Sequence, residues 1–248
     1  MTDVTIKGWL AVAGLVVAVV AGCNSGTPPS LTPEQVPAAF LALTSKPART
    51  VHIEWSGSTS GGDGNLPQDF SASVDLAGQD FAGSVKTDFG KPGAESTVEF
   101  ARVNGHSYER GQGEGAWQPL PTELSAVDPL RALSAADVEY VGAEVRDGRD
   151  VHYLRLHNFD SLVNGLVPGI FFGSDTMGEL IDESSSTFDV WTDTAGQPIE
   201  ASVDLKPGVI VFGGRKLTAS YRLTNWNADI YIVEPSNVNL VQPPEPMP

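Results

Sequence analysis

Residues 51–56 have the sequence Val-His-Ile-Glu-Trp-Ser, in which apolar side chains alternate with polar or charged ones. Successive side chains of a β-strand point to opposite faces of its sheet, so this alternation predicts a strand with one buried and one solvent-facing side. Ile53 and Trp55 lie on the apolar side of that strand. We therefore expect both side chains on the apolar face of a sheet.

The alternation of apolar and polar residues recurs along most of the chain. Short turn sequences such as Asn104-Gly105 and Asp147-Gly148 join neighbouring runs, and such turns connect antiparallel strands. The sequence thus predicts a large antiparallel sheet with one apolar face, which another layer must cover. Further strands are expected over residues 70–76, 81–89, 98–100, 138–146, 151–157, 187–193, 199–205, 217–226 and 230–233.

Helical signals are few, and the clearest is Thr32-Pro33-Glu34-Gln35. Threonine suits the N-cap position, and proline suits the first helical position because its missing N–H has no intrahelical partner there. Pro37 conflicts with a regular helix, so we expect a short or kinked one. A second short helix is expected over residues 128–136. The predicted fold class is α+β, with a few helices on one large antiparallel sheet.

The N-terminus has the features of an export signal. Lys7 precedes an apolar run, Trp9–Gly22, which ends in small residues. Val20-Ala21-Gly22-Cys23 resembles the bacterial lipobox, which implies cleavage before Cys23 and acylation of that residue. The alternative is an uncleaved transmembrane anchor, but the apolar run is shorter than the roughly 20 residues that span a bilayer.

Composition limits the classes of protein that remain. The chain has 248 residues, is 41% hydrophobic and has a formal net charge of −16, which allows one sizeable core and disfavours nucleic acid and anionic headgroups as partners. Cys23 is the only cysteine, so no disulfide is expected. We expect a signal peptide over residues 1–22, a lipidated tether over 23–31, one domain over 32–242 and a disordered tail over 243–248.

Residues 160–181 are unusually apolar for a connection between strands. Gly165, Pro168-Gly169 and Gly173 interrupt this stretch, which disfavours one long helix. Two interpretations stay open: the stretch is a flap that gates a cavity, or it fills the open side of the sheet. The candidate gate or cavity residues within it are Leu162, Leu166, Val167, Ile170, Phe171 and Phe172.

Signals for catalysis are lacking in the sequence. A nucleophile with a base, a pair of carboxylates or a metal would be needed, and no motif for any of these is present. His52 and His152 neighbour apolar strand residues, so both are expected on the solvent-facing side. We therefore predict no catalytic residues, no metal site, no cofactor and no enzymatic activity.

Several features in chain order also carry a family resemblance. They are the lipobox, Val103–Tyr108 followed by Trp117, Val145–Val151, Val190–Asp193 and Leu223–Trp226. In their order and spacing the chain resembles the LppX/LprG group of mycobacterial envelope lipoproteins, which is similar in fold to the lipoprotein carrier LolA. The resemblance implies a curved antiparallel half-barrel, with helices over its concave face and an apolar cavity between them that holds multi-acyl lipids.

These expectations combine into one functional hypothesis. The chain is expected to be anchored through Cys23 on the extracytoplasmic face of the cell membrane and to carry or present acylated lipids or glycolipids, with a membrane transporter as a further partner. Ile53 and Trp55 are then candidate cavity residues beside the predicted flap. One alternative is an envelope protein that binds other proteins and fills its own core. The other is an enzyme acting on lipid or glycan.

Overall fold

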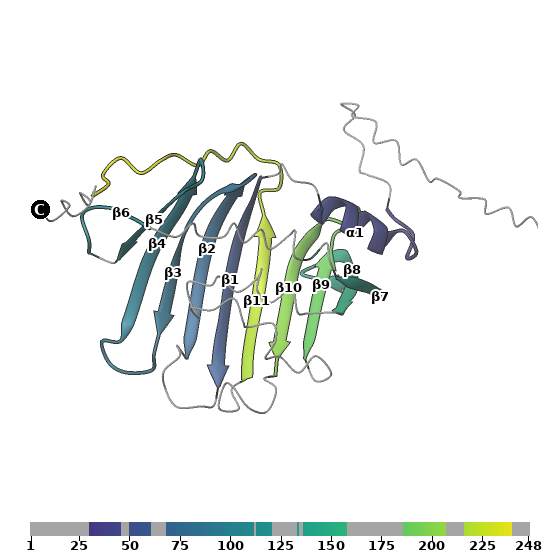
Figure 1. The fold of residues 1–248 in the computed structure, drawn as a ribbon. Helices are drawn as coiled ribbons and strands as arrows, with labels where there is room; N and C mark the ends of the chain where they lie inside the picture. The colour runs from purple at the N-terminus through teal and green to yellow at the C-terminus, as the bar shows by residue number, and fades with distance from the viewer. Residues whose placement is uncertain are drawn as a thin grey trace, which may run out of the picture.

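The structure is a computed structural model that describes residues 30–45, 50–60, 68–111, 113–120, 133, 136–157, 186–206 and 216–239. In these residues one antiparallel sheet of eleven strands accompanies a single complete helix (Figure 1). The helix is α1 (Val36–Thr44), and the strands are β1 (Thr50–Ser60), β2 (Asp69–Ala77), β3 (Asp80–Asp88), β4 (Glu95–Val103), β5 (His106–Gly111), β6 (Gln118–Pro119), β7 (Asp137–Arg146), β8 (Arg149–His157), β9 (Thr187–Thr192), β10 (Pro198–Leu205) and β11 (Lys216–Thr224).

The sheet consists of two meanders that meet at its centre. Strands β1 to β6 follow one another towards one edge, and β7 to β11 approach from the other edge. The first and last strands, β1 and β11, then pair antiparallel along nearly their full length, with Trp55 opposite Tyr221. Within the described residues β6 and β7 have no strand beyond them, so the sheet is open. This is the α+β half-barrel architecture that the sequence and the resemblance predicted.

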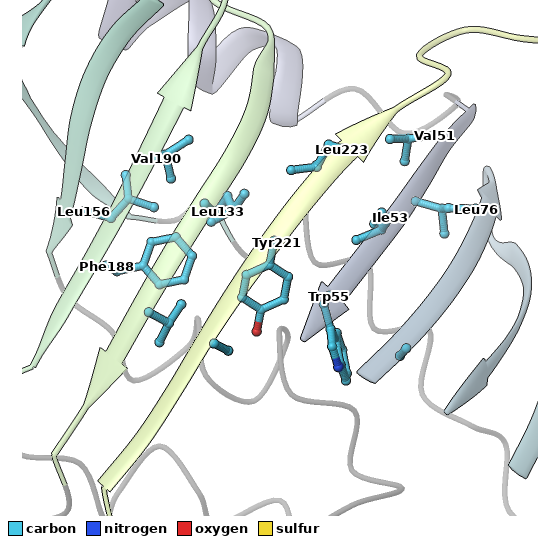
Figure 2. Packing of buried hydrophobic residues seen from close by; sticks show 14 of the residues in the cluster. Val51, Ile53, Trp55, Leu76, Leu133, Leu156, Phe188, Val190, Tyr221 and Leu223 are labelled. Atoms are coloured by element: carbon cyan, nitrogen blue, oxygen red, sulfur yellow. The ribbon is translucent and has the colours of Figure 1, made fainter. Parts of the chain in front are cut away.

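One face of the sheet carries the hydrophobic core. Strands β4, β3, β2, β1, β11, β10, β9 and β8 all contribute buried side chains to a single cluster. Figure 2 shows Ile53, Leu223, Tyr221 and Phe188 projecting to the same side from neighbouring strands. We call this surface the apolar face. The predicted alternation is confirmed, since His52 and Glu54 are more exposed than Val51 and Ile53.

Helix α1 packs on the apolar face through Val36 and Phe40, which are both fully buried. The predicted cap is wrong: Gln35, not Thr32, occupies the N-cap, and no side chain caps the helix there. The Gln35 side chain instead accepts a hydrogen bond from the Thr32 backbone N–H at 3.1 Å. Pro37 falls in the first turn, where no intrahelical bond is lost, so the helix is short but not broken.

The predicted second helix lies mostly outside the described residues. Within residues 128–136 the structure describes Leu133, which is helical, and Ala136. Both side chains are buried in the core cluster of the sheet. Figure 2 shows Leu133 above the apolar face, near β10.

The predicted strand over residues 230–233 is wrong. Residues 225–239, which we call the strap, run across the ends of the strands from β11 to β6 as an irregular segment (Figure 1). Their backbone groups bond to strand ends instead of a ladder: Thr50 donates through Oγ1 to the Ala228 carbonyl at 2.6 Å, and Trp117 exchanges backbone bonds with Asn237 and Asn239. A short apolar run such as Ile-Tyr-Ile-Val does not by itself separate a strand from such an extended strap.

A partly buried hydrogen bond holds the middle of the strap to the sheet. The hydroxyl of Tyr108, on β5, donates to the Glu234 carboxylate at 2.5 Å. This bond raises the pKa of the Tyr108 hydroxyl, because the bond stabilises the protonated phenol. The strap is thus attached at β1, at β5 and next to β6.

Gly57 lies within β1. It pairs with Phe70 of β2 and with Ala219 of β11. A Cβ atom at Gly57 would lie 2.4 Å from Cζ of Phe70 and 2.6 Å from the Thr218 carbonyl oxygen. The Phe70 ring therefore occupies the space that a side chain at Gly57 would need.

We predict that Gly57→Ala lowers the free energy of unfolding by about 1–3 kcal/mol, because the Phe70 ring and the backbone of β11 must both move. Gly142→Ala is the matched control, since a Cβ there meets nothing within 4 Å. Denaturant unfolding followed by circular dichroism measures both variants. Equal stability of the two variants would contradict the close packing at Gly57.

Candidate functional site

Three aromatic rings meet at the centre of the apolar face. The Trp55 ring, from β1, lies edge-on to Phe70 of β2, with ring centroids 6.1 Å apart, and edge-on to Tyr221 of β11 at 5.8 Å. Edge-to-face contacts of this kind suit the charge distribution of aromatic rings. The contact of Trp55 with Tyr221 joins the two meanders at the strand pair where they meet, and Figure 2 shows both side chains there.

Small residues lie beside the rings and give them room. Trp55 is opposite Ala72 on β2, and Ala219 on β11 is opposite Gly57. Ala72 and Ala219 are themselves buried in the core cluster. The large rings and their small neighbours together form the central part of the apolar face. Strand register decides which of these side chains lie opposite one another.

The apolar face is almost uncharged. Ile53, Trp55 and Tyr221 are each less than one-tenth exposed. Burial raises the pKa of the Tyr221 hydroxyl strongly, because the phenolate would lose its hydration. The hydroxyl thus stays protonated throughout the physiological pH range, and the centre of the face suits hydrocarbon.

The structure describes two of the predicted site residues. Ile53 and Trp55 lie on the apolar face, as expected from the alternation in β1. Cys23 and the predicted gate residues lie outside the described residues, so their roles remain predictions; these are Leu162, Leu166, Val167, Ile170, Phe171 and Phe172.

The expected position of His152 is wrong. It is 9% exposed and shares the inner side of β8 with Leu154 and Leu156. Its Nδ1 lies 3.4 Å from the Tyr140 hydroxyl, and Thr192 is opposite it on β9. Val151 next to it is also buried, so β8 has apolar residues on both sides and its alternation is ambiguous. The two leucines at even positions were the signal that could have placed His152 correctly.

The opposite face of the sheet is polar. His52 contacts Asp75 there at 2.7 Å, as expected for its solvent-facing position. A shallow open groove of about 460 Å³ crosses its central strands. The groove is lined mainly by hydroxyl and charged side chains, among them Ser56, Ser71, Ser73, Ser84, Lys86, Glu200, Ser220 and Arg222.

An aromatic and ionic cluster lies beside this groove on β7 to β10. Trp191 stacks on Tyr153 with ring centroids 5.3 Å apart, and the Arg146 guanidinium lies 3.7 Å from the indole centroid. Arg146 also pairs with Glu200 at 3.1 Å, and the Trp191 indole N–H donates to Glu144. These contacts engage the indole within the chain, so they favour a packing role for Trp191.

Among the described residues, no group of three or more histidine, cysteine, aspartate or glutamate side chains is arranged to hold a metal ion. Within the same ranges no helix has the length and hydropathy needed to cross a membrane. The ion pairs that the structure describes join strand residues, such as Arg155 with Asp189 at 2.9 Å and Lys216 with Asp204 at 2.8 Å.

We predict that Trp55→Ala lowers the free energy of unfolding by about 3–5 kcal/mol, because the variant loses both ring contacts and leaves a cavity. Tyr231→Ala is the control: this side chain is 81% exposed, and its loss is expected to change the stability by less than about 0.5 kcal/mol. Urea unfolding gives both values. If the two variants behave alike, Trp55 lines an accessible site instead of a packed core.

No model of a known protein family and no curated protein sequence matches the chain. Among solved structures, LprF from Mycobacterium bovis matches with a TM-score of 0.52 at 16% identity, over 83% of this chain and 99% of LprF. The lipoprotein LppX from Mycobacterium tuberculosis matches with a TM-score of 0.44 at 19% identity, over 79% of this chain and 99% of LppX.

A LolA superfamily protein from Nitrosomonas europaea matches less well, with a TM-score of 0.33 at 9% identity, over 82% of this chain and 96% of that protein. At these identities the likeness concerns the fold. Of these three, the match to LprF has a TM-score above 0.5, and it spans nearly the whole of that protein. The chain therefore has the LprF fold, and the predicted resemblance to mycobacterial lipoproteins of the LppX group is confirmed at the level of the fold.

Proposed function

We propose that this protein is a membrane-anchored lipoprotein of the cell envelope that binds multi-acyl lipids or glycolipids and carries or presents them. The observation that carries this proposal is the apolar face, which is broad, aromatic at its centre and built on an open sheet. Acyl chains need volume and an apolar lining, and their burial contributes about 25 cal/mol per Å² without specific polar contacts.

The contacts of His152 and His52 are more compatible with lipid binding than with catalysis. The His152 ring contacts the Tyr140 hydroxyl on the β7–β8 side of the sheet, while His52 on the polar face contacts the carboxylates of Asp75 and Glu54. Neither histidine is joined to a nucleophile in these contacts. We therefore propose a binding protein without enzymatic activity, in which no cofactor takes part.

The proposed attachment runs through Cys23. The lipobox implies that this residue carries the lipid and becomes the mature N-terminus, and two or more acyl chains make a stable anchor. Residues 23–31 would then tether the domain to the extracytoplasmic face of the cell membrane. The ligand would be drawn from that membrane or received from a transporter within it.

One observation favours the alternative of a protein-binding lipoprotein. Trp55, Phe70 and Tyr221 are all less than one-tenth exposed, as they would be in a core filled by the chain itself. In that case the apolar face would be structural, and the acidic surface would bind another envelope protein. Ligand capture distinguishes the two functions.

We predict that the mature chain with Cys23→Ala, purified from a lipid-rich bacterial host, retains acylated lipid. Native mass spectrometry should show adducts with lipid masses that disappear on organic extraction. The extracted protein should regain such adducts from envelope lipids. A chain that stays folded but takes up no envelope lipid supports the protein-binding alternative.

The predicted gate residues allow a second test. Leu166→Asp and Phe171→Asp should reduce lipid uptake about tenfold or more, because a charge at the entrance to an apolar site opposes passage of acyl chains. Val141→Asp is the matched control, since Val141 is 43% exposed on the edge strand β7. Uptake of a fluorescent lipid analogue measures all three variants. Unchanged uptake in both gate variants would contradict the gating role.

A further inference from the structure

The strap and the start of α1 lie at the same end of the sheet (Figure 1). The Leu31 backbone N–H donates to the Thr194 carbonyl, in the turn between β9 and β10, at 3.0 Å. At the neighbouring strand ends, the Asn227 N–H in the strap donates to the carbonyl of Thr50, the first residue of β1. Hydrogen bonds thus attach both segments to one end of the half-barrel, which we call the strap end.

The strap turns large apolar side chains outwards. Tyr231 is 81% exposed and Val233 is 77% exposed, while Ile230 and Ile232 between and beside them are half-buried. Hydrogen bonds at Ala228 and Glu234 hold the strap on either side of this stretch. The outward position of the two side chains is therefore fixed by the alternation and by the attachments of the strap. Two large apolar side chains on one segment are thus available for contact with an apolar surface.

At the opposite end of the sheet the structure describes one connection in full, the turn between β3 and β4. This turn contains Gly90, Lys91 and Gly93, which are all exposed. The large hydrophobic residues that are exposed in the described chain are Val141, Val145, Tyr231 and Val233, and none of them is in that turn. Val145 is near the end of β7, which is again at the strap end.

The tether length limits which end can approach the membrane. Cys23 lies eight positions before Leu31, and an extended chain covers that separation in at most about 28 Å at ~3.5 Å per residue. Strand β1 alone has 11 residues, or about 36 Å at ~3.3 Å per residue. An anchor at Cys23 therefore holds the strap end close to the bilayer and leaves the opposite end free to lie away from it.

We propose that the strap end is the membrane-facing surface of the protein, and that Tyr231 and Val233 insert into the boundary between headgroups and acyl chains. A tyrosine suits this boundary because its ring is apolar and its hydroxyl remains hydrated. Asp229 and Glu234 flank the two residues, so the contact is apolar, not a basic attraction to anionic lipid. The proposal rests on the Cys23 anchor of the proposed function.

The test uses the acylated full-length mature protein in vesicles of phosphatidylcholine with brominated acyl chains. Because Cys23 is the only cysteine and its thiol is acylated, an introduced cysteine provides a single site for a fluorescent label. Ser236→Cys places the label on the strap, and Lys91→Cys places it at the opposite end. We expect at least about twofold quenching at Ser236 and none at Lys91, with little change between low and high salt.

Variants identify the side chains responsible. Replacing Tyr231 and Val233 together by serine should remove more than half of the quenching at Ser236, while Val141→Ser should leave it unchanged. Equal quenching of the two labels, or stronger quenching at Lys91, overturns the proposed orientation alone. A mature protein that lacks acyl chains and does not bind vesicles overturns the anchor and this orientation together. Lipid capture, measured separately, tests the apolar face independently of both.

Discussion

The antiparallel pairing of β1 with β11 is the interaction on which the rest of the structure depends. Each meander alone would present half of the apolar face, and the pairing makes one continuous surface of the two halves. The contact of Trp55 with Tyr221 crosses this seam, so side-chain packing and backbone hydrogen bonds reinforce the same junction. The strap adds a second connection, since it continues from β11 past the start of β1 to β6.

Local sequence patterns predicted the strands and turns well. The expected hairpin turns have the backbone that their residues favour, with positive φ at Asn104 and Gly105 and again at Asp147 and Gly148. Ile53 and Trp55 were placed correctly because β1 alternates cleanly. These features depend on neighbours in sequence, and a single chain contains that information.

Features that depend on distant residues were harder to predict. Residues 230–233 are the β-branched and aromatic run Ile-Tyr-Ile-Val, which is typical of a strand, but β11 already pairs with β1 and β10, so the segment passes over the strand ends instead. His152 was assigned to the wrong face because burial on β8 involves both of its sides. The pairing of Trp55 with Tyr221, which defines the centre of the candidate site, also depends on strand order. Alternation alone does not specify that order.

The open edges of the sheet affect whether copies of the protein associate with one another through additional strand pairing. Register shifts between Tyr140 and Gly142 make an irregularity in β7, and charged residues such as Glu139 and Glu144 flank it. At the other edge β6 has only two residues and ends at Pro119. Irregular, charged, short or proline-containing edges are poor templates for an additional strand. An anchored population confined to a membrane surface would therefore collide edge to edge without polymerising.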